Sequence, residues 1–225
     1  MSQITYLQSV NRVLVKLRED ELTTLAGVMS YNKLIAQLIN EAKEEVENAW
    51  EWNYQRASVD ITTVAGTDTY AITGAGQDSI IEAVMDTISR FQLPGPINNA
   101  WVDFNRTVST ANIQTGSATY FDLVGVDASG QLKLRITPTP SAATTIRVFG
   151  RIHQNYLSTG TDDNTFVRAP WRPVIYLAYK KAVSERGEDG GQPLSEVDSD
   201  YTKALNDAIA LDQRYGHVNT DWYPN

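Results

Sequence analysis

The 225-residue sequence contains no cysteine. This absence excludes a disulfide scaffold, thiol catalysis and zinc sites built on cysteine. No apolar run approaches the roughly 18 residues that would indicate a membrane span. The first residues, Met1 to Tyr6, lack the basic and apolar regions of a secretion signal. We therefore expect a protein that is made in the cytoplasm of its cell and does not enter a membrane.

Basic residues are also scarce. The chain has 19 Lys and Arg against 27 Asp and Glu, which gives a formal net charge of −8. A DNA-binding domain normally neutralises phosphates with clustered basic side chains, and that pattern is missing. The acidic balance fits an ordinary soluble protein, and it equally fits a surface past which DNA moves without adhering. Charge alone does not choose between them.

Motifs of catalysis and metal binding are absent as well. The two histidines, His153 and His217, belong to no metal-ligand spacing. The sequence has no nucleophile elbow, phosphate-binding loop or dinucleotide fingerprint. We interpret Gly74-Ala75-Gly76 as a turn and Asp162-Asp163-Asn164 as a surface turn. No catalytic residue, cofactor or metal is predicted, and the sequence indicates that the protein is not an enzyme.

Helical periodicity is present in the first fifty residues. Thr5 with Gln8 matches a capping box, although Ser2 is an equally good cap. A second amphipathic helix follows, with Ser30 as its predicted cap. Its apolar stripe comprises Tyr31, Leu34, Ile35, Leu38, Ala42, Val46 and Ala49. Its predicted solvent face comprises Lys33, Gln37, Asn40, Glu44, Glu47 and Glu51, so the acidic cluster Glu41, Glu44, Glu45, Glu47 and Glu51 is read as solvated.

The middle of the chain, about residues 56 to 153, is rich in Thr, Val, Ile and Tyr and is broken by turn residues. Leu132, Leu134 and Ile136 alternate with Lys133 and Arg135, the pattern of a half-buried antiparallel strand. Six strands are predicted, centred on residues 59–62, 69–72, 80–84, 119–123, 132–136 and 145–149. Short strands at this spacing favour a small sandwich or barrel.

Helical patterns return near the end of the chain. Pro170 occupies a predicted first helical position and Gly187 a stop, while Ser195 opens a last helix that ends at Gly216. Neither the two helices before the β zone nor the two after it can bury their apolar faces as a pair. We therefore expect all four helices to pack together. The predicted fold class is α+β: an antiparallel bundle of about four helices from both chain ends, with an inserted β-sandwich or barrel-like domain. The predicted boundaries are 1–55 and 156–215 for the helices, 56–155 for the β domain, and 216–225 for an extended C-terminal tail.

Two groups of large aromatic residues fall at boundaries. Trp50 and Trp52 follow the second helix, and we interpret them as a hydrophobic seam between the helical and β zones. Trp222 and Tyr223 lie in a segment with no periodicity of its own. Such aromatics are usually buried somewhere, so they either fold back on the same subunit or dock into a neighbour.

The order and spacing of several segments resemble phage head-to-tail adaptor proteins, including the tail tubular protein A type of short-tailed phages. The similar segments are residues 10–14, 17–20, 38–42, 50–52, 62–70, 136–140 and 182–191, and the resemblance spans nearly the whole chain. The resemblance implies a homo-oligomeric ring, usually of twelve subunits, seated at the head–tail junction of the virion.

The same resemblance implies a set of partners. The ring would contact the portal protein above and a downstream tail or nozzle protein below, while DNA passes through its channel without sequence-specific binding. The C-terminal segment would grip the portal, with Tyr215, His217, Trp222, Tyr223 and Pro224 as the candidate contact residues. No cofactor and no membrane are implied.

Two other classes of function stay open on the sequence. A peripheral binding module of the virion, such as a fibre or a carbohydrate-binding sandwich, could use the β zone, with Trp101 or Tyr120 stacking on a sugar. An enzyme such as a peptidoglycan hydrolase would need paired carboxylates or a metal site, and no convincing set of residues is present.

Overall fold

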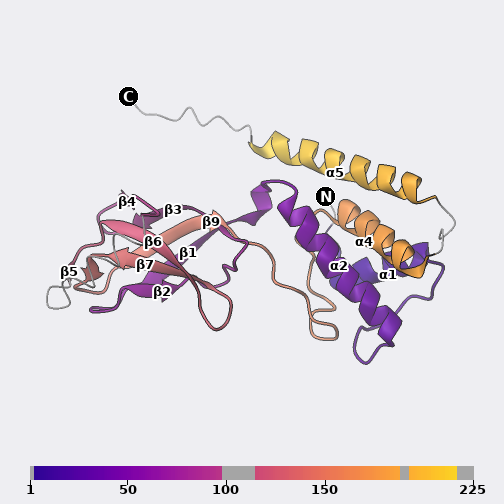
Figure 1. Ribbon diagram of the computed structural model, residues 1–225, viewed down its shortest axis with the longest axis horizontal. Helices are drawn as coiled ribbons and strands as arrows, with labels where there is room; N and C mark the ends of the chain where they lie inside the picture. The colour runs from indigo at the N-terminus through magenta and orange to yellow at the C-terminus, as the bar shows by residue number, and fades with distance from the viewer. Residues whose placement is uncertain (1–2, 98–114, 188–192, 217–225) are drawn as a thin grey trace. The chain divides into compact units, whose positions relative to one another are not determined.

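The computed structural model describes residues 3–97, 115–187 and 193–216. Its chain divides into two compact units (Figure 1). One unit, the helical unit, takes residues 1–54 and 154–225, and the other, the β unit, takes residues 55–153. Four helices and several antiparallel sheets confirm the predicted mixed class of helices with antiparallel β structure.

The first helix, α1 (Tyr6–Lys16), begins with the predicted capping box. Thr5 Oγ1 accepts the N–H of Gln8 at 3.3 Å, and Gln8 Oε1 accepts the N–H of Thr5 at 3.0 Å. These two bonds satisfy backbone donors that a helix start leaves without partners. Val10 and Leu14 are buried one turn apart, as the periodicity predicts.

The second helix, α2 (Ser30–Asn48), differs from its prediction at three places. Ala49, predicted to lie on the apolar stripe, is the C-cap residue and is exposed. Met29, not Ser30, is the N-cap residue, and no side chain caps the helix. Asn40 and Glu47, predicted to face solvent, are buried together with Lys43. The prediction treated α2 as covered on one side only, whereas a distant segment of the chain covers a second side.

The last two helices are α4 (Trp171–Arg186) and α5 (Leu194–Gly216). Pro170 is the N-cap of α4, one residue before its predicted position, and α5 begins one residue before Ser195. Gly187 ends α4 in the left-handed conformation with φ of +65°, which glycine adopts without steric cost. Helix α4 contacts α1, α2 and α5, and all four helices contribute to one hydrophobic core.

The tryptophans that follow α2, predicted to form a seam between the helical and β zones, pack within the helical unit. Trp52 is buried in the core of the helical unit, where its Nε1–H donates to the Val46 carbonyl at 2.7 Å. Trp50 packs against the same core. Both indoles therefore stabilise the helical unit itself, because the backbone after α2 turns back over the end of that helix.

The described strands of the β unit form three sheets, and a short 3-10 helix (Asn53–Gln55) precedes the first strand. The four-stranded sheet has the order β1-β9-β3-β4, the three-stranded sheet β2-β7-β6, and β5 pairs with β8 in parallel. The strands are β1 (Arg56–Thr62), β2 (Thr69–Ala71), β3 (Ile80–Asp86), β4 (Phe91–Leu93), β5 (Thr115–Gly116), β6 (Tyr120–Val126), β7 (Leu132–Thr137), β8 (Thr139–Pro140) and β9 (Thr145–Arg151). Ile146 and Val148 of the larger sheet share one hydrophobic core with Leu134 and Ile136 of the smaller.

One side chain of β7 is more buried than its alternating pattern predicts. Arg135 is 6% exposed and donates to Asp122, which lies directly opposite it on β6, at 2.8 Å. A carboxylate on the neighbouring strand therefore makes burial of the guanidinium possible. Neither strand pattern by itself identifies this pair.

Candidate functional site

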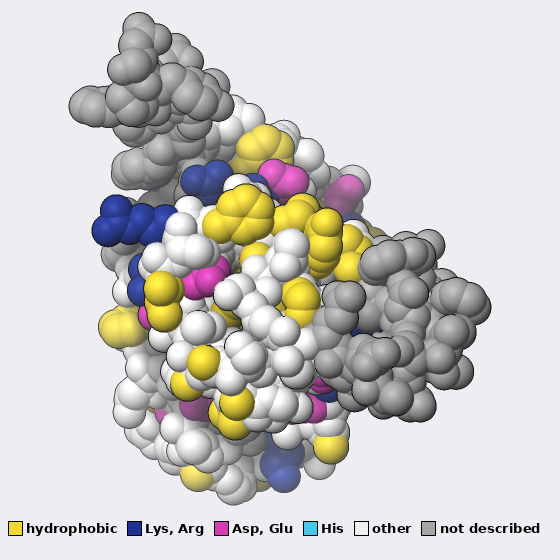
Figure 2. Space-filling view, turned by 90° about the vertical axis from the view of Figure 1, so that its left-hand side faces the viewer, with side chains coloured by type: hydrophobic (Ala, Val, Ile, Leu, Met, Phe, Trp, Pro, Cys, Tyr) yellow, Lys and Arg dark blue, Asp and Glu magenta, His cyan; other side chains and the backbone are white. Residues whose placement is uncertain are grey.

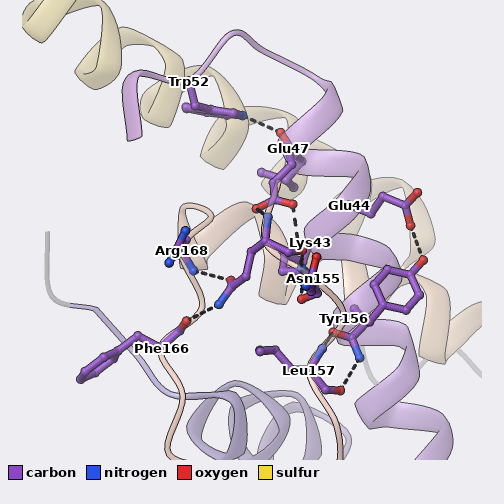
Figure 3. Close-up of polar contacts among 12 residues, drawn as sticks. Lys43, Glu44, Glu47, Trp52, Asn155, Tyr156, Leu157, Phe166 and Arg168 are labelled. Carbon is purple, nitrogen blue, oxygen red and sulfur yellow. Dashed lines mark hydrogen bonds and ion pairs between the residues drawn. The ribbon is translucent and has the colours of Figure 1, made fainter. Parts of the chain in front are cut away.

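A buried polar cluster in the helical unit joins α2 to residues 154–157, the segment with which the chain returns from the β unit (Figure 3). Lys43 Nζ donates to the carbonyl oxygens of Gln154 and Asn155, the second at 2.9 Å. Glu47 accepts the N–H of Gln154 at 3.4 Å and lies 3.9 Å from Lys43 Nζ. Two ionisable side chains thus satisfy the backbone of a segment more than 100 residues away.

Asn40 extends the cluster by one turn of α2. Its side chain donates to the Leu157 carbonyl and accepts the Leu157 N–H, both at 2.9 Å. It also donates to the Tyr6 hydroxyl at 3.1 Å, and Tyr6 donates to the Ala36 carbonyl at 2.8 Å. Burial raises the pKa of Tyr6 to about 12, although the bond from Asn40 opposes this shift. Tyr6 is therefore a neutral structural donor at physiological pH.

The charges of Lys43 and Glu47 are held away from water. Burial lowers the pKa of Lys43 and raises the pKa of Glu47, and in both cases the opposite charge of the partner opposes that shift. Perturbed pairs of this kind are common in catalytic sites. Here both side chains are only 1% exposed, so a substrate has no access to them. The geometry supports an anchoring function.

The returning segment, residues 154–157, makes further hydrogen bonds through its side chains. The Gln154 side chain donates to the Phe166 carbonyl at 2.8 Å and accepts the Arg168 N–H at 2.9 Å. Tyr156 donates to the carboxylate of Glu44. Residues 154–157 therefore bridge α2 and the strand-like segment 166–168 that leads into α4 (Figure 3).

The outgoing connection after α2 is held by α5. The Asn53 N–H and side-chain amide donate to the Asp212 carboxylate at 3.2 and 3.1 Å, and Trp50 Nε1–H donates to it at 3.3 Å. Both connections to the β unit therefore begin from points that are hydrogen-bonded within the helical unit.

The predicted surface turn at residues 162–164 is a turn, but Asp163 within it is buried. Its carboxylate accepts from Leu25 N–H, Thr24 hydroxyl and Gly160 N–H, each at 2.8 Å. Burial by itself raises its pKa, yet these three bonds together hold the pKa below the ordinary aspartate value. Asp163 therefore fixes the loop before α2 to the loop before α4.

A groove of about 520 Å³ opens beside α5 in the helical unit. Most of its lining is apolar or aromatic, including Tyr54, Val167, Pro170, Trp171, Ala208 and Leu211. The Arg12 guanidinium lies 4.1 Å from the centre of the Trp171 ring and holds the indole by a cation–π contact. A surface of this composition is suited to another polypeptide segment.

The β unit exposes hydrophobic side chains near the end of its larger sheet. Ile88 is 70% exposed, and Phe91 on the edge strand β4 is 51% exposed. Hydrophobic side chains gather over part of the face drawn in Figure 2. Exposed apolar side chains beside a sheet edge are typical of surfaces that another chain covers.

The residues predicted to bind the portal lie near the C-terminal end of the sequence. His217, Trp222, Tyr223 and Pro224 lie outside the described residues, as does the side chain of Tyr215. Of the two aromatic residues considered for sugar stacking, Trp101 also lies outside them. Tyr120 begins β6 and is 40% exposed.

Within residues 3–97, 115–187 and 193–216, no three His, Cys, Asp or Glu side chains are grouped so as to hold a metal ion. Among the helices that the structure describes, none is long and apolar enough to cross a membrane.

The aromatic groove and the exposed apolar edge are surfaces suited to contact with another polypeptide. A family model described as SU10 adaptor protein matches residues 4–221. The chain therefore belongs to the SU10 adaptor protein family, and its role is that of a structural adaptor of a phage. Membership implies a location in the virion and contacts with portal and tail proteins. A search of curated proteins found no match.

Proposed function

We propose that this protein is the head-to-tail adaptor of a tailed phage, forming a ring of twelve subunits that joins the portal to the tail. The observation that carries the proposal is the family match, which covers both the helical unit and the β unit. The proposal also divides the chain as the sequence predicts: helices of an antiparallel bundle in 1–55 and 156–215, an inserted β sandwich in 56–155, and a tail in 216–225.

The hydrogen bonds that hold the two connecting segments support a mechanical role for the protein. Lys43, Glu47 and Asn40 hold the returning segment, and Asp212 holds the outgoing one. A ring between a DNA-filled head and a tail must keep its parts connected while a genome passes. Hydrogen bonds that are buried at the returning connection and partly buried at the outgoing one resist local opening there.

The ring would close by head-to-tail contacts between copies. Such heterologous contacts join two different surfaces, and they close only when the rotation between neighbours completes a circle. The exposed edge at β4, with Ile88 and Phe91, is a candidate for one of these surfaces. The portal would take the segment that contains Tyr215, His217, Trp222, Tyr223 and Pro224.

The net charge is consistent with a channel role. The chain has a net charge of −8, so a lumen lined by its acidic side chains would repel DNA phosphates and keep the genome from adhering during packaging and ejection. A strongly basic lumen would contradict this part of the proposal.

Electron microscopy of the protein mixed with the portal of its phage tests the proposal. Full-length protein is expected to add a second ring to the portal, and a variant truncated after Gly216 is expected to add none. An added ring with both proteins would keep the adaptor function and reject the tail as the portal anchor. No added ring with either protein would contradict the adaptor function.

A further inference from the structure

The groove beside α5 has the shape and lining of a site that is filled by a peptide. Its volume of about 520 Å³ lies within the roughly 300–1,000 Å³ of cavities that bury small ligands. A second hollow of about 240 Å³ shares Pro170, Trp171, Ala208 and Leu211 with it and extends it along α5. Leu211 is 37% exposed, so an apolar side chain stands in the opening.

The lining also includes polar side chains, among them Asn53, Arg168 and Asp212. A polypeptide hydrogen-bonds such groups through its backbone and fills the apolar rest of the groove with its side chains.

The chain itself carries a segment of suitable chemistry next to this groove. Ala208, Leu211 and Asp212 of α5 line it, and α5 ends at Gly216. The residues that follow, 217–225, include Trp222, Tyr223 and Pro224. Two aromatic side chains and a proline are more stable in contact with an apolar and aromatic lining than in contact with water.

The segment is long enough to return to the groove. From Gly216 back to Ala208, α5 rises about 12 Å at 1.5 Å per residue. The six residues from 217 to 222 span up to about 20 Å when extended. Trp222 can therefore reach the wall formed by Ala208 and Leu211 without any change in the helices.

We propose that this groove binds residues 217–225 of the same chain, with Trp222 seated against Trp171 and Leu211. The inference goes beyond the ring and does not depend on it. In a subunit that has not yet met a portal, the docked segment covers two large aromatic side chains that would otherwise be exposed. A portal that takes this segment must first displace it from the groove.

The absence of native cysteine allows a direct test in the full-length chain. Gln3 lines the groove and is exposed, so Gln3→Cys together with Asn225→Cys places one thiol at the groove and one beyond Trp222. The rate of disulfide formation within single chains is measured under mild oxidation at low protein concentration. The same pair is then measured with Trp222→Ala, and separately with Leu211→Glu. The matched control for the charge is Val15→Glu, an exposed position on α1 that does not line this groove.

The disulfide is expected to form at least about tenfold more slowly with Trp222→Ala and with Leu211→Glu than in the parent pair, and at the parent rate with Val15→Glu. Equal rates in all four proteins would overturn the proposal, because the segment would then meet the groove only by diffusion. Disulfides that join two chains, with a yield that rises with concentration, would overturn it in favour of a second copy as the occupant. These outcomes do not depend on portal binding, so the groove and the adaptor function can fail separately.

Discussion

Among the described residues, a pair of opposite charges is buried in the helical unit and another in the β unit, and the two pairs are built differently. Lys43 and Glu47 lie one turn apart on α2, 3.9 Å from each other, and their hydrogen bonds go to the backbone of residues 154–155. Asp122 and Arg135 lie opposite each other on neighbouring strands at 2.8 Å. The first pair attaches a distant segment to a helix, whereas the second fixes the register of two strands.

The largest expected effect comes from removing the cation of the helical pair. Lys43→Met leaves the Glu47 carboxylate buried without its opposite charge and leaves the carbonyls of Gln154 and Asn155 without their donor. We expect a loss of about 3–5 kcal/mol in the free energy of unfolding. Urea titration followed by tryptophan fluorescence measures it, since Trp50, Trp52 and Trp171 all lie in the helical unit. A loss below about 1 kcal/mol would show that α2 does not need this anchor.

A smaller effect is expected from the pair in the β unit, because Arg135 does not also hold a distant segment. Arg135→Met should cost about 3 kcal/mol, and adding Asp122→Leu should restore most of it, because both charges are then gone. Amide hydrogen exchange of β6 and β7 measures both variants.

An exposed pair supplies the matched control for this experiment. Arg147 and Asp60 also lie opposite each other on antiparallel strands, but both are exposed to solvent. Arg147→Met should leave the exchange of its strands unchanged, since solvent screens this pair. Equal losses for Arg135→Met and Arg147→Met would contradict the role given to burial.

Asp163 should show an intermediate effect with a distinct dependence on pH. Asp163→Asn weakens bonds to Thr24, Leu25 and Gly160 and should cost about 2 kcal/mol at pH 7. Because the folded pKa lies below the unfolded value of about 3.9, the stabilisation is complete above about pH 5. It is lost as pH falls through the folded pKa, so the two proteins should converge in acid. Urea midpoints from pH 7 to pH 3 test this, and a difference that does not change with pH would contradict it.

The smallest expected effect concerns the start of α1. Thr5→Ala removes the side-chain half of the capping box and should cost about 1 kcal/mol. Thermal unfolding of this variant, compared with Thr5→Ser, which keeps the hydroxyl, measures the contribution of the cap. If both variants lose the same amount, the hydroxyl is not what stabilises the helix start.

Local signals in the sequence predict much of the fold. The capping box at Thr5, the glycine stop at Gly187 and the six predicted strands depend on neighbouring residues, and the structure has each of them. Strands β4, β5 and β8 have only two or three residues, too few to display an alternating pattern. Their pairing depends on residues far away in the chain.

The sequence does not predict the buried polar cluster, because the residues that cover it are far away in the chain. Asn40, Lys43 and Glu47 follow one another at three- and four-residue steps, so they share one face of α2. A polar helix face is predicted to be exposed to solvent when nothing indicates that another segment covers it. The segment that covers this face, residues 154–157, is more than 100 positions away in the sequence. Likewise, the sequence alone does not reveal that Trp52 turns back over α2.

The most direct test of the adaptor function is an electron cryomicroscopy reconstruction of the head–tail junction in virions of the phage that encodes this chain. The expected result is a ring below the portal whose subunits fit the helical unit, with the cluster of Asn40, Lys43 and Glu47 intact in each copy. Density for this fold at a fibre or on the outer surface of the particle, and none at the junction, would contradict the adaptor function and favour a peripheral binding module.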